Sequence, residues 1–333
     1  MAEEVADRGA AKRSFMLPLR VAASAIMLAF LLPKVSHSTL FERWNARTAL
    51  WLLAALAVTL FGIWLSAVRW RQVLSALGLR TRTRTLLSHY LAGQFVGNFL
   101  PSTIGGDVLR VTRLSASNGD RHDSFASVVL ERLTGWLVLP VICLTGLIIN
   151  PTLLDLGAAS AVAVVLSIAT LVLLVVLVAA GASPKLGRRL EGRAGWRRFV
   201  EAVHLGIDRF RHRPGAAVAV LAVGFAYQLA VVVAAYFAAR ALGLDVGPTA
   251  ILAFMPAVAI AQVLPISVGG LGVREGAFVL FLHPLGVATG DAVALGLLVY
   301  GLNLTVSLLG APAFAVGART ATVIPGDRTT PRA

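Results

Sequence analysis

The chain has 333 residues, of which 57% are hydrophobic and 14% are charged, and its mean hydropathy is +0.81. A soluble domain carries roughly 45–50% apolar and about 25% charged residues, so the composition excludes a water-soluble globular protein and predicts an all-α polytopic membrane protein. The net charge of +14 does not indicate nucleic-acid binding, because the arginines abut apolar segments and are not interleaved with aromatic residues.

Apolar stretches long enough to cross a bilayer, which takes about 20 residues, recur along the chain. They are 17–33, 49–68, 124–149, 158–181, 215–241 and 288–316. The first follows a tail of mixed charge with no small-residue cleavage site, so we expect a retained helix and no signal peptide. The single cysteine, Cys143, excludes an internal disulfide.

Two further apolar stretches, 86–117 and 249–283, are each interrupted by the same pattern. The first contains NFLPSTIGGDVLR and the second QVLPISVGGLGVR, and Arg274 follows Arg110 by 164 residues (274 − 110). Proline removes a helix hydrogen bond and a glycine pair lets the backbone reverse. Each stretch is therefore either a kinked span or a hairpin that enters and leaves the membrane on the same side.

The distribution of charge favours the hairpin. The basic loop 69–85 and the basic linker 182–214 should both be cytoplasmic. Two plain spans lie between them and return the chain to its starting side, so a full crossing at 86–117 would place the linker outside. The two arms of the first hairpin, of about 22 Å and 16 Å, are also shorter than the roughly 30 Å hydrocarbon core.

The same offset relates the spans that flank the hairpins, since 49–68 corresponds to 215–241 and 124–149 to 288–316. The second half begins on the opposite side of the membrane, which predicts an inverted-topology repeat. The expected order is a cytoplasmic tail (1–16), a first membrane half (17–181), an amphipathic cytoplasmic linker (182–214), a second membrane half (215–316) and a cytoplasmic tail (317–333).

Charged side chains inside a membrane are costly and usually face a cavity or a partner. Arginine suits phosphate because its planar fork binds two oxygens at once, which favours a polar chamber for an anionic headgroup. The alternative is that the same residues form structural ion pairs that hold the hairpins closed. The charged candidates are Asp107, Arg110, Glu131 and Arg132 in the first half, and Arg274 and Glu275 in the second.

Backbone groups are the second kind of candidate. Helices that start just after Gly106 and Gly270 would offer free N–H groups to an anion. Arg113 is expected at the membrane interface with its guanidinium directed to water. We expect no enzyme activity, no cofactor and no metal site, because the histidines are scattered and GGLGVREG lacks the strand of a dinucleotide loop.

The segments NFLPSTIGGDVLRVTRL, ERLTGW and LPISVGGLGVREGAF resemble the lysylphosphatidylglycerol synthase/flippase transmembrane family, over roughly residues 17–316. This chain has Ser267-Val268 where that family often has Pro-Gly. It also ends soon after its last span, so the soluble aminoacyl-transferase domain is expected to be absent and lipid translocation without synthesis is implied. The family's motif residues, carried over by position, are Asn98, Pro101, Gly105, Gly106, Asp107, Arg110, Glu131, Arg132, Pro265, Gly269, Gly270, Gly272 and Glu275.

The resulting expectation is a multi-pass, bacterial-type cell-membrane protein that moves an anionic phospholipid or a polyprenyl-phosphate-linked headgroup between leaflets. Without an ATPase motif, a gradient, mass action or a partner would drive it. Its expected partners are membrane lipids, a second copy of the chain or a cell-envelope enzyme. The alternatives are a secondary transporter of a small anion and a scaffold for a cell-envelope glycosyltransferase. The motif residues that would contact the substrate also include Gln262 and Arg274.

Overall fold

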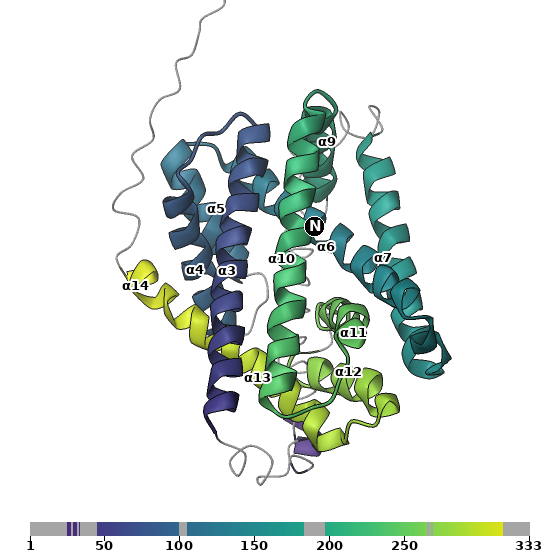
Figure 1. Cartoon of the computed structure of the whole chain (residues 1–333). Coiled ribbons are helices and arrows are strands. Elements are labelled where there is room, and N and C mark those ends of the chain that lie inside the picture. Colours follow the sequence, from purple (N-terminus) through teal and green to yellow (C-terminus); the bar gives the residue numbers. More distant parts are fainter. Residues whose placement is uncertain are drawn as a thin grey trace, which may run out of the picture.

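Every regular element that the structure describes is a helix (Figure 1). Five helices are long and apolar enough to cross a membrane, so the chain is an all-α polytopic membrane protein. Most of the expected first span, together with Pro101 and Pro265, lies outside the described residues. The computed structural model describes residues 25–27, 29–31, 33, 45–99, 105–182, 197–264, 267 and 269–315.

The helices follow the predicted order, with two differences in length. The first long helix continues past the predicted end at 68, so that Arg69 belongs to a helix and not to a loop. The last predicted span is divided into two helices. The first half contains α3 (Ala46–Ala76), α4 (Thr83–Phe99), α5 (Gly105–Asn118), α6 (Arg121–Ile149), η2 (Pro151–Asp155) and α7 (Ala158–Ala182). The linker contains α9 (Arg197–Arg211), and the second half contains α10 (Pro214–Ala241), α11 (Pro248–Ala261), α12 (Val273–Leu282), η3 (His283–Leu285), α13 (Thr289–Leu308) and α14 (Gly310–Ala315).

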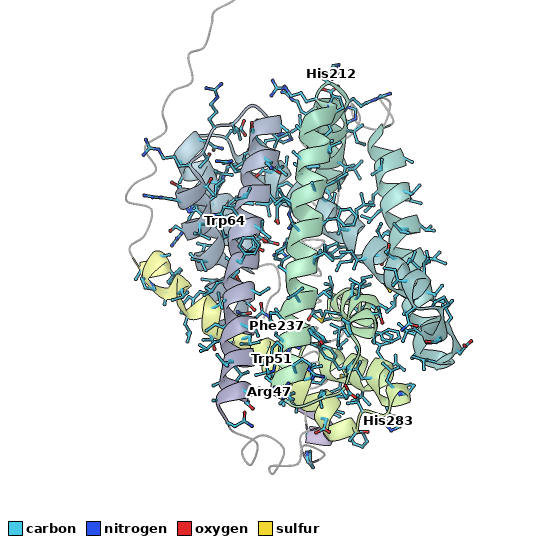
Figure 2. All side chains as sticks on the ribbon, in the orientation of Figure 1. Arg47, Trp51, Trp64, His212, Phe237 and His283 are labelled. Atoms are coloured by element: carbon cyan, nitrogen blue, oxygen red, sulfur yellow. The ribbon has the colours of Figure 1, made fainter. Side chains whose placement is uncertain are left out.

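Helices α3 and α10 occupy equivalent positions in the two halves and pack against each other in opposite directions. Near one end, the rings of Trp51 and Phe237 are 5.3 Å apart, and Figure 2 shows both labels well away from His212, which lies at the other end. Near that other end, Arg213 donates to the carbonyl oxygen of Ser75 (3.3 Å). The two equivalent helices are therefore antiparallel, as an inverted repeat requires.

Contacts between the halves occur in reciprocal pairs. Helix α6 of the first half packs on α11, and its counterparts α13 and α14 pack on α4. Likewise α10 packs on α6, and α3 packs on α13. Exchanging the two halves thus converts each of these contacts into its partner, which is the signature of a pseudo-two-fold relation, whereas the contacts of α7 with α11 and α12 have no counterpart among the described helices.

Each motif stretch forms a pair of antiparallel arms. In the first pair, Leu86 near the start of α4 and Leu114 near the end of α5 meet Leu74, from the end of α3, in one buried cluster. The two ends of this first hairpin therefore lie together, at the end of the bundle where α3 stops.

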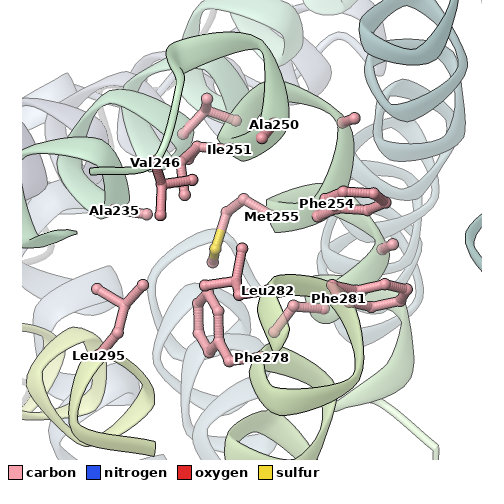
Figure 3. Close-up of a cluster of buried hydrophobic side chains, with 14 of the residues drawn as sticks. Ala235, Val246, Ala250, Ile251, Phe254, Met255, Phe278, Phe281, Leu282 and Leu295 are labelled. Carbon is pink, nitrogen blue, oxygen red and sulfur yellow. The ribbon is translucent and has the colours of Figure 1, made fainter. Parts of the chain in front are cut away.

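The second hairpin, α11 and α12, opens at the opposite end of the bundle. Asn150, just after α6, donates to the hydroxyl of Thr249 in the first turn of α11 (3.0 Å). The rings of Phe254 and Phe281 stack at 5.1 Å, inside the apolar cluster shown in Figure 3. The position of both hairpins within a bilayer stays a prediction.

The linker helix α9 lies across α6 and α7. Val200, Ala202 and Val203 are buried on its inner face, whereas the charged residues Asp208 and Arg209 are exposed. Its inner face can come close because a side chain at Gly206 would collide with Leu130. The helix is therefore amphipathic, and residues 183–196 of the linker lie outside the described residues.

Candidate functional site

Five charged side chains from three helices form one continuous chain of ion pairs, which we call the arginine ladder. Glu131 on α6 accepts from Arg69 on α3 (Nε to Oε1, 3.1 Å) and from Arg110 on α5 (Nη2 to Oε2, 3.1 Å). Asp107 accepts from Arg110 (Nη1 to Oδ1, 3.1 Å) and from both Nε and Nη2 of Arg132 (3.0 Å each). Each carboxylate therefore bridges two arginines, and an arginine stands at each end.

The close approach of α4 and α5 positions Arg110. Gly93 lies against this arginine, because a Cβ there would come within 2.8 Å of both Arg110 Cγ and the carbonyl oxygen of Gly106. Gly97, four residues later, faces Gly106 at ordinary contact distance (3.8 Å from a Cβ). Small residues four apart let membrane helices pack closely, so the glycines of the first hairpin make the space that Arg110 occupies.

Arg69 also lies over a glycine. A Cβ at Gly135 on α6 would stand 2.9 Å from Nη1 of Arg69. The carbonyl oxygen of the same glycine accepts from Gln228 on α10 (3.3 Å), and the Arg69 guanidinium lies 5.1 Å from the ring centre of Tyr227. Helices from both halves therefore hold Arg69.

Aromatic rings stabilise the centre of the arginine ladder. The guanidinium carbon of Arg110 lies 4.2 Å from the ring centre of Trp70 and 4.6 Å from that of Tyr90. Such contacts attract a cation through the electron-rich ring face. Trp70 is itself fixed, because its indole N–H donates to Ser127 (3.0 Å).

The arginine ladder carries an excess of positive charge away from water. Three arginines oppose two carboxylates, which leaves one positive charge (3 − 2 = 1). Arg69, Arg110 and Glu131 are at most 3% exposed, whereas the Arg132 side chain is 51% exposed. The ladder thus has one buried end and one open end.

Several buried polar atoms around the arginine ladder have no hydrogen-bond partner among the described residues. They include Nη1 of Arg69 and Nε of Arg110. Unpaired buried polar groups are costly and usually bind water, an ion or a ligand. Further such atoms belong to α3 and α4, in Ser66, Gln72, His89, Gln94 and Asn98. The arginine ladder therefore offers buried N–H donors on Arg69 and Arg110 that are free to bind an anion.

The second hairpin holds a simpler pair. Arg274 donates to Oε1 of Glu275 through Nε (3.1 Å) and Nη2 (3.0 Å), and Oε2 of Glu275 accepts from the backbone N–H of Gly272 (2.6 Å). The Arg274 guanidinium also lies 4.7 Å from the ring centre of Tyr300. One positive and one negative charge cancel here, and among the described residues no hydrogen bond or ion pair joins this pair to the arginine ladder.

The described helix starts lie close to the predicted backbone sites but do not coincide with them. In the first hairpin, α5 is described from Gly105 onwards, so Gly106 belongs to the first turn of that helix, where it packs against Gly93 and Gly97. In the second hairpin, Gly269 and Gly270 have φ values of +60° and +77°, and α12 begins only at Val273. The Glu275 carboxylate accepts from the N–H of Gly272, the residue just before α12, so the chain's own carboxylate takes a place where an anion could bind.

The sequence-predicted residues have different outcomes. The structure brings Asp107, Arg110, Glu131 and Arg132 into one network, and it pairs Arg274 with Glu275. Gln262 instead lies against Gly270: a Cβ added at Gly270 would stand 3.0 Å from the Cβ of Gln262. Asn98 lies on α4 with its amide nitrogen buried and without a partner, whereas Pro101 and Pro265 are outside the described residues.

Sequence reasoning missed Arg69 and misplaced Arg113. Arg69 was assigned to a cytoplasmic loop, although Ser66, Trp70 and Val73 share its buried stripe on α3 at helical spacing. Arg113 does not direct its guanidinium to water: it is 8% exposed and donates to the carbonyl oxygens of Ala313 (2.8 Å) and Phe314 (3.0 Å). Continuing the helical period past residue 68 would have found Arg69, whereas no local pattern indicates the partners of Arg113.

Comparison with known proteins agrees with this architecture. The chain is 28% identical to the protein named Glycosyltransferase AglD of Haloferax volcanii, in an alignment covering 88% of this chain and 52% of that relative. The chain thus spans about half the length of the curated relative it matches. The family described as Lysylphosphatidylglycerol synthase TM region matches residues 17–310, which is most of the chain and includes both hairpins. The protein therefore belongs to the Lysylphosphatidylglycerol synthase TM region family.

Proposed function

We propose that the protein moves lipids with an anionic phosphate headgroup, either a phospholipid or a polyprenyl phosphate, from one leaflet to the other. The observation that carries the proposal is the arginine ladder, with its one excess positive charge and its unpaired donors on Arg69 and Arg110. A buried uncompensated cation is costly in a membrane, and a bound phosphate neutralises it. Membership of a family of membrane regions named for a lipid synthase supports a lipid as the ligand.

The shape of the arginine ladder supports a direction of entry. Arg132, the exposed end, is able to meet a headgroup at the protein surface, and Asp107 and Arg110 connect it to the buried end at Arg69. A phosphate that exchanges with the carboxylates along this series keeps a cationic partner at each position. Movement down the lipid's own gradient needs no further energy source.

Reconstitution in liposomes tests the proposal. Fluorescent phosphatidylglycerol and phosphatidylcholine, both labelled on an acyl chain, are placed in the outer and inner leaflets, and an impermeant quencher reports their exchange. We expect the protein to accelerate the anionic lipid more than the zwitterionic lipid. Equal exchange of both lipids, or uptake of a soluble anion without lipid exchange, would contradict a lipid headgroup site.

A matched pair of variants separates the site from the fold. Arg110→Lys keeps the charge but loses the fork that binds two oxygens, so we expect at least a tenfold loss of lipid exchange, equivalent to about 1.4 kcal/mol, with thermal stability nearly unchanged. Arg240→Lys, at an exposed pair with Asp245, should behave as the wild type. The double variant Asp107→Asn with Arg110→Gln should restore folding at most, and full lipid exchange in it would end the headgroup hypothesis.

One finding favours a second function, a membrane scaffold for a glycosyltransferase. The relative that this chain matches over about half its length is named a glycosyltransferase. If the chain only anchors such an enzyme, its deletion should displace the partner from the membrane, and the purified protein should not change lipid exchange in liposomes. Lipid exchange that requires no other protein would exclude this reading.

A further inference from the structure

Arg113 has a different kind of partner from the other buried arginines of the first hairpin. Arg69, Arg110 and Arg132 each pair with a carboxylate. Arg113 is also buried, but within the described residues its hydrogen bonds go only to the backbone carbonyl oxygens of Ala313 and Phe314 in α14. Those carbonyls carry partial negative charge, so they compensate a full positive charge less than a carboxylate does.

Helix α14 is docked closely on the first hairpin. Gly310, its first residue, lies so near the backbone carbonyl of Leu91 on α4 that any Cβ would collide. At its other end, the ring of Phe314 lies 6.1 Å from that of Phe95 and 5.7 Å from the Arg113 guanidinium. Helix α14 therefore covers α4, and Arg113 holds the covering helix through the carbonyl oxygens of Ala313 and Phe314.

The pseudo-symmetric contact in the other half has no such arginine. Gly146 on α6 precedes Gly310 by 164 residues (310 − 146), and a Cβ there would come within 2.7 Å of the backbone of Ala253 on α11. The residue at the position of Arg113 in that half is Ala277. Close docking of this helix on a hairpin therefore does not require an arginine, and Arg113 is an addition on the side of the arginine ladder.

Arg113 is also placed to reach the headgroup site. It follows Arg110 by three residues on α5, so the two side chains share a helix face. Both also act electrostatically on the buried ring of His89, whose nitrogens have no partner among the described residues. Arg113 therefore lies on the same helix face as Arg110 of the arginine ladder and also attaches α14.

Resting on the proposed function, we propose that Arg113 is a further headgroup ligand that exchanges between two partners. In the structure it binds the carbonyls of α14, and with a phosphate at Arg110 it turns to the phosphate and releases α14 from the first hairpin. A phosphate carries a full negative charge and presents two oxygens to the planar fork of an arginine, whereas the carbonyls of α14 are neutral, so an anion competes well with two carbonyls. A ligand that binds the released state better shifts the population towards it.

Disulfide formation between Phe95→Cys and Phe314→Cys, in a Cys143→Ser background, measures the docked state directly. The protein is placed in nanodiscs of phosphatidylcholine with or without phosphatidylglycerol, and the rate of oxidative crosslinking is recorded. We expect the anionic lipid to slow crosslinking about fivefold, the lower end of usual coupling between sites. The matched control is Asn150→Cys with Thr249→Cys across the other docking contact, where the lipid should have no effect.

Variants of Arg113 keep the result interpretable. Arg113→Gln should lower crosslinking in both lipids and remove the difference between them, whereas Arg113→Lys should retain part of the difference because the charge remains. Two results would overturn the proposed exchange of partners by Arg113. One is crosslinking that does not depend on the lipid in the protein that retains Arg113, and the other is an unchanged lipid effect in Arg113→Gln. Because crosslinking is scored without lipid transport, lipid-sensitive crosslinking in a protein that moves no lipid would sink only the proposed function.

Discussion

The two hairpins share a register in the sequence and differ in what they contain. The first packs through Gly93, Gly97 and Gly106, and the corresponding positions of the second are Ala257, Ala261 and Gly270. Ala257 and Ala261 add methyl groups to the second hairpin, which the apolar cluster of Figure 3 fills. The glycines of the first hairpin instead leave space for arginine side chains.

The charges differ in the same way. The positions of Arg69, Glu131 and Arg132 correspond in the second half to Val233, Leu295 and Gly296, which cannot form ion pairs. Only Arg110 has a charged counterpart, Arg274, and Glu275 neutralises it locally. One fold unit used twice thus supplies a polar site in one orientation and an apolar support in the other, so repeated motifs do not imply repeated function.

The opposite openings of the two hairpins give the largest expected difference. In a Cys143→Ser background, Arg121→Cys should react with an impermeant thiol reagent only from the cytoplasm, and His283→Cys only from outside. Both native side chains are exposed in the structure, and the positive-inside rule assigns the sides. Labelling of both positions from the same side would disprove the inverted arrangement of the hairpins.

Removing the central carboxylate should be the most damaging single change to stability. Glu131→Ala leaves Arg69 and Arg110 buried without their shared partner, which costs roughly 3–5 kcal/mol. Thermal unfolding of the purified protein measures it. The triple change Arg69→Met, Arg110→Met and Glu131→Leu should recover much of that stability without lipid exchange, and a Glu131→Ala protein as stable as the wild type would show that the ladder is not buried in the membrane.

The glycine contacts allow a finer test within one helix. Gly93→Ala places a methyl group against Arg110 and Gly106, and overpacking of this kind costs about 1–3 kcal/mol. Gly97→Ala meets only ordinary contacts and should be neutral or slightly stabilising, since alanine favours a helix by up to about 1 kcal/mol over glycine. Equal unfolding temperatures for the two variants would contradict the close packing at Gly93.

The smallest effect is expected at the second turn. Gly269 has a φ of +60° with open space around it, so Gly269→Ala should cost about 1–2 kcal/mol from backbone strain alone. Gly269→Asn should cost less, because asparagine tolerates this conformation. If alanine and asparagine lowered the unfolding temperature equally, side-chain contacts and not backbone conformation would explain why position 269 requires glycine.

Periodicity and charge predicted much of this fold, because they act locally. Hydropathy located the long helices, the charge of the loops predicted antiparallel hairpin arms, and the 164-residue offset predicted which helices of the two halves pack as equivalents. The two Gly pairs have the same spacing within their motifs, but this did not predict the same backbone conformation. Gly106 lies in a helix and Gly270 has a positive φ, because the conformation depends on the surroundings.

The site was predicted only in part, for the same physical reason. Asp107 and Arg110 are three residues apart on one helix, so sequence spacing sufficed to pair them. Glu131 joins Arg69 across 62 residues, and Arg113 joins Phe314 across 201 residues. Pairings of that length depend on how the helices pack, and composition does not encode them in any local pattern.

The distance along the chain between Arg69 and Glu131 also has a consequence for biosynthesis. At a synthesis rate of about 5–20 residues per second, the 62 intervening residues take roughly 3–12 s, during which α3 has no counter-ion from α6. We predict that nascent chains truncated before residue 131 keep α3 at the insertion machinery or lose it to proteolysis, whereas Arg69→Leu releases α3 early. Site-specific photocrosslinking of arrested chains would distinguish the wild type from Arg69→Leu. If α3 were released equally early from both chains, Arg69 would not hinder the entry of α3 into the lipid without α6.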